Sequence, residues 1–129
     1  MSVNAERLFN EAIIVVTYTP PFKGEDVITA NQKVSEIAAE INGEIYRIAD
    51  MRNVQIPWPE LLTALQEATR RNTGTLRDTR IHSIFVGTDE SIRLAVDSLR
   101  QAQYGSIQAG LFATLDEAVS FARRQLSQN

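Results

Sequence analysis

Polar residues follow the ends of four apolar runs, and at these positions the sequence could bind or convert a ligand. Tyr18 and Asp50 close the first two runs, and Thr88 and Thr114 come just after the next two. In open α/β sheets, ligand sites gather where strands end and helices begin. Backbone N–H groups at helix starts near Thr88 and Thr114 are also able to hold an anion. One hypothesis is therefore a small-molecule or anion site, or a minor enzyme, at this edge of a sheet.

The same residues have a structural explanation. Threonine and aspartate are preferred N-caps, so Thr88 or Asp89, and also Thr114, can each begin a helix without holding a ligand. The carboxylate of Asp50 can pair with Arg52 or with a nearby backbone N–H. The sequence leaves both explanations open.

The stretch from Asp50 to Trp58 is the other candidate surface. Asp50 leads into a polar turn that contains Arg52 and Asn53, and Trp58 stands between two prolines at a predicted helix start. An exposed tryptophan is a frequent anchor for a protein partner, and burial beside the helix start is the alternative. The candidate binding residues are Asp50, Arg52, Asn53, Trp58, Tyr18, Thr88 and Thr114.

The residues used in catalysis and metal binding are few. The chain has no cysteine and a single histidine, His82, at the start of a predicted strand, whereas a metal site needs several converging ligands. No dinucleotide fingerprint, phosphate-binding P-loop or nucleophile elbow occurs. We therefore predict no catalytic residues, no metal and no cofactor, and we favour a non-enzymatic binding protein.

Four arginines cluster near a loop predicted for residues 71–80. Together they could grip a phosphate or an acidic partner, and a solvated surface is the simpler alternative. These residues are Arg70, Arg71, Arg77 and Arg80.

The elements that position these residues alternate between strands and helices. Runs of β-branched and other apolar residues predict strands, and apolar residues at steps of three and four predict helices. Residues 1–10 are either a frayed arm or an extra edge strand. Alternation of this kind predicts an α/β fold with a four-stranded, mostly parallel sheet and about four helices. The predicted strands are residues 12–18, 44–50, 82–87 and 107–112, and the helices are residues 25–41, one from about 59, one from 88 or 89, and one from 114 to nearly the end.

The bulk composition sets limits on partners and location. The 129 residues fit one domain, residues 1–129, and the net charge of −3 argues against nucleic acid. No apolar run approaches the roughly 20 residues of a membrane span, and the N-terminus lacks the pattern of a signal peptide. We expect a soluble cytoplasmic protein without membrane contact, in which a homodimer is a reasonable form.

Two motifs resemble those of a known family. Residues 48–54, Ile-Ala-Asp-Met-Arg-Asn-Val, are similar to the central strand and turn of STAS-like domains, which include the SpoIIAA-type anti-sigma-factor antagonists. Residues 111–119 resemble the closing strand, threonine cap and acidic helix start of that family. The matching order of strands and helices covers about residues 11–127. The resemblance implies a SpoIIAA-like fold and a regulatory domain that binds a protein partner or a second copy of itself.

One departure from the family concerns its phosphorylation switch. SpoIIAA-type antagonists carry a phosphorylatable serine at the start of the helix after the central strand. Here the corresponding residues 55–60, Gln-Ile-Pro-Trp-Pro-Glu, contain no serine or threonine. We therefore expect this chain to lack the family's phospho-acceptor.

Overall fold

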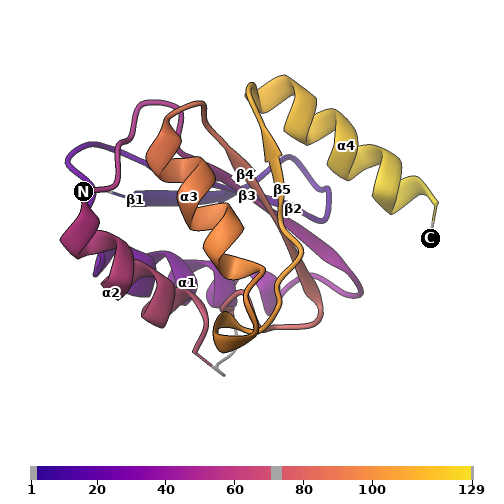
Figure 1. Ribbon diagram of the computed structural model, residues 1–129. Coiled ribbons are helices and arrows are strands. Elements are labelled where there is room, and N and C mark those ends of the chain that lie inside the picture. The colour runs from indigo at the N-terminus through magenta and orange to yellow at the C-terminus, as the bar shows by residue number, and fades with distance from the viewer. Residues whose placement is uncertain (1–2, 71–73, 129) are drawn as a thin grey trace.

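The computed structural model describes residues 3–70 and 74–128 of the chain (Figure 1). Strands and helices alternate after an initial strand pair, as the periodicity predicts. In chain order the elements are β1 (Val3–Arg7), β2 (Ile13–Tyr18), α1 (Asp26–Ala38), β3 (Ile45–Asp50), α2 (Trp58–Ala68), β4 (Ile81–Val86), α3 (Glu90–Leu99), the 3₁₀ helix η1 (Ala102–Tyr104), β5 (Gly110–Phe112) and α4 (Leu115–Ser127).

The strands form one sheet in the order β1-β2-β3-β4-β5, with β2 to β5 parallel. The α/β class and the mostly parallel sheet are confirmed, but the count of four strands was wrong. The additional strand is β1, which pairs antiparallel with β2 at the sheet edge. Its sequence alternates between buried Val3 and exposed Asn4 and Glu6, so it lacks the continuous apolar run of a strand covered on both faces.

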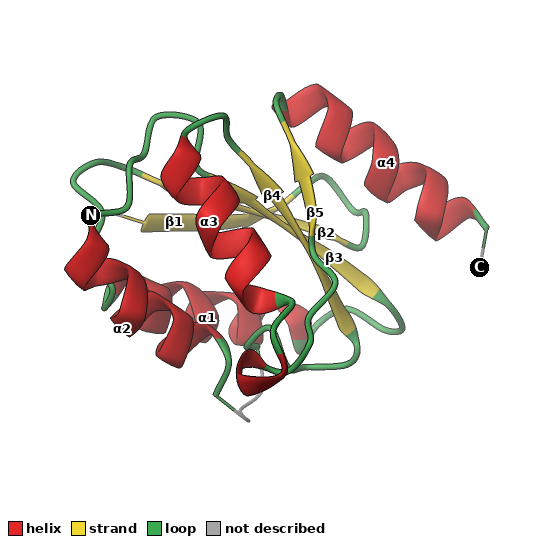
Figure 2. Ribbon diagram, in the orientation of Figure 1, coloured by secondary structure: helices red, strands yellow, loops and turns green. Residues whose placement is uncertain are grey.

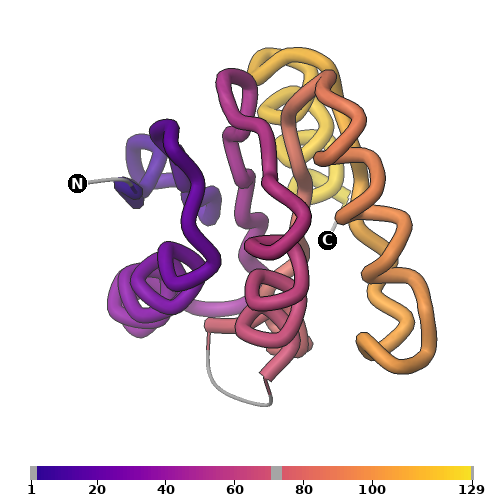
Figure 3. Tube along the Cα trace, turned by 60° about the vertical axis from the view of Figure 1, so that its left-hand side comes forward, coloured from indigo at the N-terminus to yellow at the C-terminus, as the bar shows by residue number. Residues whose placement is uncertain are grey.

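Because strand order equals chain order, the colours in Figure 3 run across the molecule from indigo at one edge to orange at the other. Helices cover both faces of the sheet unequally. α1 packs on β1, β2 and α2, and α2 also contacts α3. α4 packs alone against β3, β4 and β5 on the opposite face (Figure 2). β3 is therefore the central strand and is enclosed from both sides.

Helix ends follow the local signals. Asp89 caps α3 by accepting a hydrogen bond from the Ser91 N–H, and Thr114, an expected cap, forms a capping box with Glu117 at the start of α4. α1 ends earlier than predicted, at Ala38, and Gly43 follows with a φ of 80°. β5 is shorter than predicted because the chain after α3 forms η1 and a turn before it reaches the sheet.

The α4 layer is close-packed by small residues. Ala118 and Ala122 are fully buried and face Ile13, Ile48 and Ile84 of the sheet. The absence of long side chains at these two positions lets the helix backbone approach the strands closely. Within the described residues, no helix is both long enough and apolar enough to cross a bilayer.

Candidate functional site

Asp50 and Arg52 form a closed ion pair at the end of β3. The Asp50 carboxylate accepts hydrogen bonds from the Arg52 Nε at 2.9 Å, from its Nη2 at 2.8 Å and from its backbone N–H at 3.3 Å. The Asp50 side chain is 7% exposed and the Arg52 side chain is 49% exposed. Hydrogen bonding to Asp50 raises the pKa of Arg52. Both charges are thus satisfied within the turn, as the structural explanation from the sequence predicts.

The turn after β3 is fixed to the core and to α3. Met51, Val54 and Ile56 are buried. The Ile56 backbone N–H donates to the Ser91 Oγ at 2.8 Å, and the Ser91 backbone N–H donates to the Asp89 carboxylate at 2.9 Å. Hydrogen bonds from Ser91 lower the pKa of Asp89, and the bond from the Ser91 hydroxyl contributes more than the bond from its backbone N–H. Residues that follow this turn are therefore held on a well-supported segment of backbone.

Trp58 begins α2 and is exposed to solvent over 63% of its surface. Leu62, one helical turn later, is also exposed. The edge of α2 that carries Glu60 faces the loop before α1, where the Glu60 carboxylate accepts a hydrogen bond from the Gly24 N–H at 2.6 Å. Helical spacing places Trp58 and Leu62 away from that edge. We call these two side chains the Trp58 surface.

The other predicted site residues lie in separate places. Arg52, Asn53 and Thr88 line one open depression of about 640 Å³ at the strand ends, together with the Pro20–Phe22 segment. Thr114 instead accepts a hydrogen bond from the Glu117 N–H at 3.2 Å in the α4 cap. The structure thus brings together three of the seven candidate residues at this depression.

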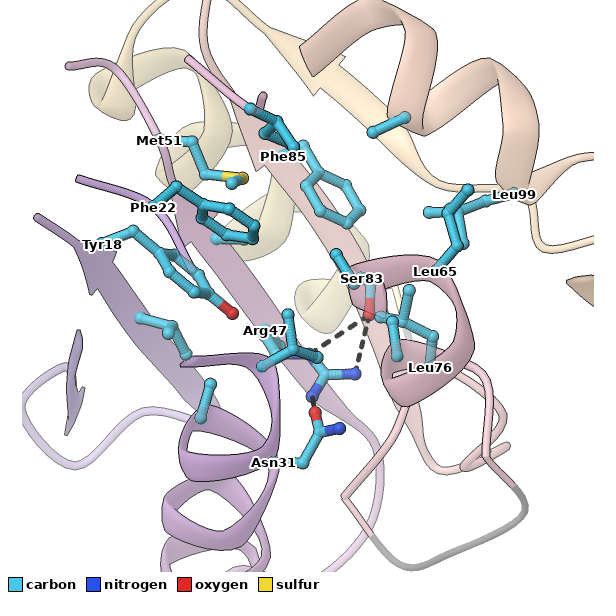
Figure 4. Close-up of a pocket in the computed structure, with 18 of the residues that line it drawn as sticks. Tyr18, Phe22, Asn31, Arg47, Met51, Leu65, Leu76, Ser83, Phe85 and Leu99 are labelled. Carbon is cyan, nitrogen blue, oxygen red and sulfur yellow. Dashed lines mark hydrogen bonds between the residues drawn. The ribbon is translucent and has the colours of Figure 1, made fainter. Parts of the chain in front are cut away.

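Tyr18 lines an internal cavity between the sheet and helices α1, α2 and α3 (Figure 4). The cavity has a volume of about 60 Å³ and is walled mainly by apolar side chains. Its polar lining consists of Tyr18, Asn31, Arg47 and Ser83. Burial raises the pKa of the Tyr18 phenol to about 12, so the hydroxyl keeps its proton at neutral pH.

Arg47 projects from the central strand into this cavity and is 4% exposed. Its Nη1 donates to the Gly74 carbonyl at 2.5 Å and to the Asn31 Oδ1 at 3.4 Å. Its Nε and Nη2 both donate to the Ser83 Oγ, at 3.3 and 3.1 Å. None of the ion pairs among the described residues includes Arg47. Burial lowers the pKa of Arg47 to about 10, which still leaves it charged at neutral pH.

Sequence reasoning did not single out Arg47, although a signal is present. It is the only basic residue in β3, and it alternates with Ile45 and Ala49. In a strand, residues two apart share a face, so this arginine had to lie beside apolar neighbours on a covered face.

His82 and the loop arginines have structural partners. The exposed His82 Nε2 lies 3.2 Å from the Glu44 carboxylate, and its ring stacks on Tyr46. Arg77 donates to the Thr69 carbonyl. Arg80 donates to the backbone carbonyls of Ala38, the last residue of α1, and of Ile41 and Gly43, which follow that helix. The described residues contain no cluster of three or more His, Asp or Glu side chains suited to a metal ion. Arg70 pairs with Glu67, and Arg71 lies outside the described residues.

The fold is an α/β domain with a mostly parallel sheet, an antiparallel edge strand and helices on both faces. A solved structure from Shewanella loihica PV-4, an uncharacterized protein from the DUF3478 family with a SpoIIAA-like fold, is similar to this chain. The match has a TM-score of 0.59 and 11% identity, and covers 93% of this chain and 91% of the other. The chain therefore has a SpoIIAA-like fold. No protein-family model and no curated protein matches the sequence.

Proposed function

We propose that this chain is a non-enzymatic, cytoplasmic regulatory domain that binds a protein partner through the Trp58 surface. The observation that carries the proposal is the exposure of Trp58 over 63% of its surface, at a position where the surrounding backbone is firmly anchored. Tryptophan is enriched among the residues that dominate binding energy at protein interfaces. A large apolar side chain on a fixed segment also loses little conformational freedom on binding.

The Trp58 surface combines an exposed apolar area with neighbouring polar groups, as the centre and rim of a protein interface do. Leu62 extends the apolar area along α2, because residues four apart are neighbours on a helix surface. The ion pair between Asp50 and Arg52 lies in the preceding turn and supplies polar groups that are already paired. The turn over residues 55–60 lacks serine and threonine, so we propose that the contact is not switched by phosphorylation there.

A ligand site at the strand ends is the less favoured alternative. Of its predicted residues, Tyr18 lines the internal cavity and Thr114 caps α4, so neither shares the depression lined by Arg52, Asn53 and Thr88. The positive charge of Arg52 is also already matched by Asp50. The geometry therefore favours the Trp58 surface.

The experiment exploits the fact that Trp58 is the single tryptophan of the chain. Its fluorescence emission reports on the proposed contact without any label. We expect a blue shift when the surface is covered, either as the protein concentration rises, if the partner is a second copy, or on addition of a captured partner. Sedimentation velocity over the same concentrations separates these two cases.

The decisive comparison uses Trp58→Ala and a matched control, Phe9→Ala. Phe9 is 78% exposed and lies in the turn between β1 and β2, at the opposite end of β2 from the strand-end turns. We expect Trp58→Ala to remain folded and to lose association or partner capture at least about tenfold, with Phe9→Ala like the wild type. Equal binding by Trp58→Ala, or unfolding of that variant, would refute the proposal.

A further inference from the structure

The internal cavity beneath α1 and α2 contains a buried positive charge, Arg47, that forms no ion pair with any of the described residues. Every acceptor that Arg47 reaches is neutral: the Gly74 carbonyl, the Asn31 amide oxygen and the Ser83 hydroxyl. Asp78 exerts an electrostatic influence on Arg47, but its carboxylate accepts hydrogen bonds from the backbone N–H groups of Gly74 and Arg80 and forms no ion pair with Arg47 among the described residues. A buried charge without a counter-ion is costly, so this arrangement calls for an explanation.

Donor capacity remains free at this end of the cavity. A guanidinium has five N–H donors, and two of them, on Nε and Nη2, share the single Ser83 oxygen. One further N–H of Nη2 has no acceptor among the described residues. The Tyr18 hydroxyl points into the cavity on the Arg47 side (Figure 4), and no hydrogen bond to it occurs in the described part of the chain. An acceptor with negative charge between these groups would satisfy both.

The opposite end of the cavity is apolar. Phe22, Met51 and Phe85 lie there, away from the guanidinium (Figure 4). The volume of about 60 Å³ is more than a single water molecule needs and too small for a large organic ligand. The space therefore suits a ligand with one charged end, one short apolar end and very few heavy atoms.

We propose that this cavity binds a short aliphatic monocarboxylate, with its carboxylate against Arg47 and the Tyr18 hydroxyl and its carbon chain directed toward Met51 and Phe85. A monoanion matches the charge of Arg47, the one charged side chain among the described residues that line the cavity. A doubly charged anion such as phosphate would carry an unmatched negative charge into the apolar site, and a neutral ligand would leave the arginine unpaired. A carboxylate also fits the planar fork of a guanidinium with two parallel hydrogen bonds.

The groove between α1 and α2 gives the ligand a route inward. Asn31 lines both the cavity and this surface groove, which Ile28, Gln32 and Glu67 also line. The Asn31 side chain accepts from Arg47 and donates to the Glu67 carbonyl at 3.2 Å, so it stands between the groove and the cavity. Rotation of this one side chain away from Arg47 would open the polar end of the cavity to the groove.

The test is a titration of the folded wild-type chain with acetate, propionate, butyrate and octanoate at neutral pH, followed by two-dimensional amide NMR. Propionamide serves as the uncharged control of matched shape. We expect saturable shifts of residues around Arg47 and Ser83 with the short acids, none with propionamide, and affinity that no longer improves at octanoate. Absence of saturable binding, equal binding of propionamide, or affinity that rises steadily to octanoate would overturn the proposal.

Three variants assign the binding to this site. We expect Arg47→Met to weaken propionate by more than about thirtyfold and Tyr18→Phe by about tenfold, because each removes a hydrogen-bond donor to a charged group. Arg52→Met, which removes an arginine at the strand-end turn, should bind as the wild type does. Unchanged affinity in Arg47→Met would contradict the assignment. If Arg47→Met does not fold, then Tyr18→Phe against Arg52→Met decides: equal affinities would overturn the proposal.

Discussion

Replacing Arg47 by methionine tests whether the buried charge lacks an internal partner, because the two opposing effects can be weighed from the structure. Methionine keeps much of the apolar stem and removes the charge. Burial lowers the pKa of Arg47 from 12.5 to about 10. At about 1.4 kcal/mol for each pKa unit, this corresponds to a net cost of about 3 kcal/mol for holding the charge, after the favourable influence of Tyr18 and Asp78, and methionine does not carry it.

The loss of hydrogen bonds opposes this gain. Gly74 is buried, and its carbonyl loses the Arg47 donor at 2.5 Å. A buried acceptor left without a partner costs about 1–3 kcal/mol. Ser83 and Asn31 are only partly buried, so water can replace the donor they lose. The two effects nearly cancel, and we expect the free energy of unfolding of Arg47→Met to lie within about 2 kcal/mol of the wild type.

The assay is urea unfolding at neutral pH in buffer free of carboxylic acids, with Arg47→Ala as the comparison. Alanine removes the stem as well as the charge, so this variant should be about 2–5 kcal/mol less stable than Arg47→Met. Removing one partner of a true buried ion pair costs about 3–5 kcal/mol. A loss of that size in Arg47→Met would show that the charge is neutralised within the fold, and the reasoning from an unpaired arginine would fail.

Two further predictions concern the ends of α4 and β2. Thr114→Ala removes the capping hydrogen bond from the Glu117 N–H and should lower the free energy of unfolding, measured in urea, by about 1 kcal/mol. The control is Ser120→Ala, which removes an exposed hydroxyl within α4 and should leave the free energy of unfolding unchanged. Equal losses in the two variants would show that the cap does not stabilise the fold. Because burial raises the pKa of Tyr18 from 10.0 to about 12, the folded chain keeps a proton that the unfolded chain releases, so wild-type stability should fall from pH 10 to pH 12 relative to Tyr18→Phe. Absorbance titration of tyrosinate checks this, since the late-ionising group should be missing from Tyr18→Phe, and identical pH profiles of stability would contradict the burial of this phenol.

The sequence predicted those parts of the structure that depend on near neighbours. Apolar periodicity located the helices and the parallel strands, and the preference of threonine for N-cap positions predicted Thr114 as the cap of α4. The pairing of Asp50 with Arg52 was also accessible, because the two residues are separated by one position in a tight turn. Hydrogen-bond and periodic signals of this kind act over a few residues, so they can be read without the fold.

The tertiary structure decided which side chains meet across the chain. From the sequence, Trp58 could be either buried or exposed. In the structure, the edge of α2 that carries Glu60 faces the loop before α1, and Trp58 is left in solvent. Alternation along β3 fixed the face on which Arg47 lies, but only the packing of α1 and α2 over that face enclosed its charge with Tyr18 from β2 and Ser83 from β4. Burial depends on residues far apart in sequence, and for that reason the strand-end turn could be predicted from the sequence whereas the internal cavity could not.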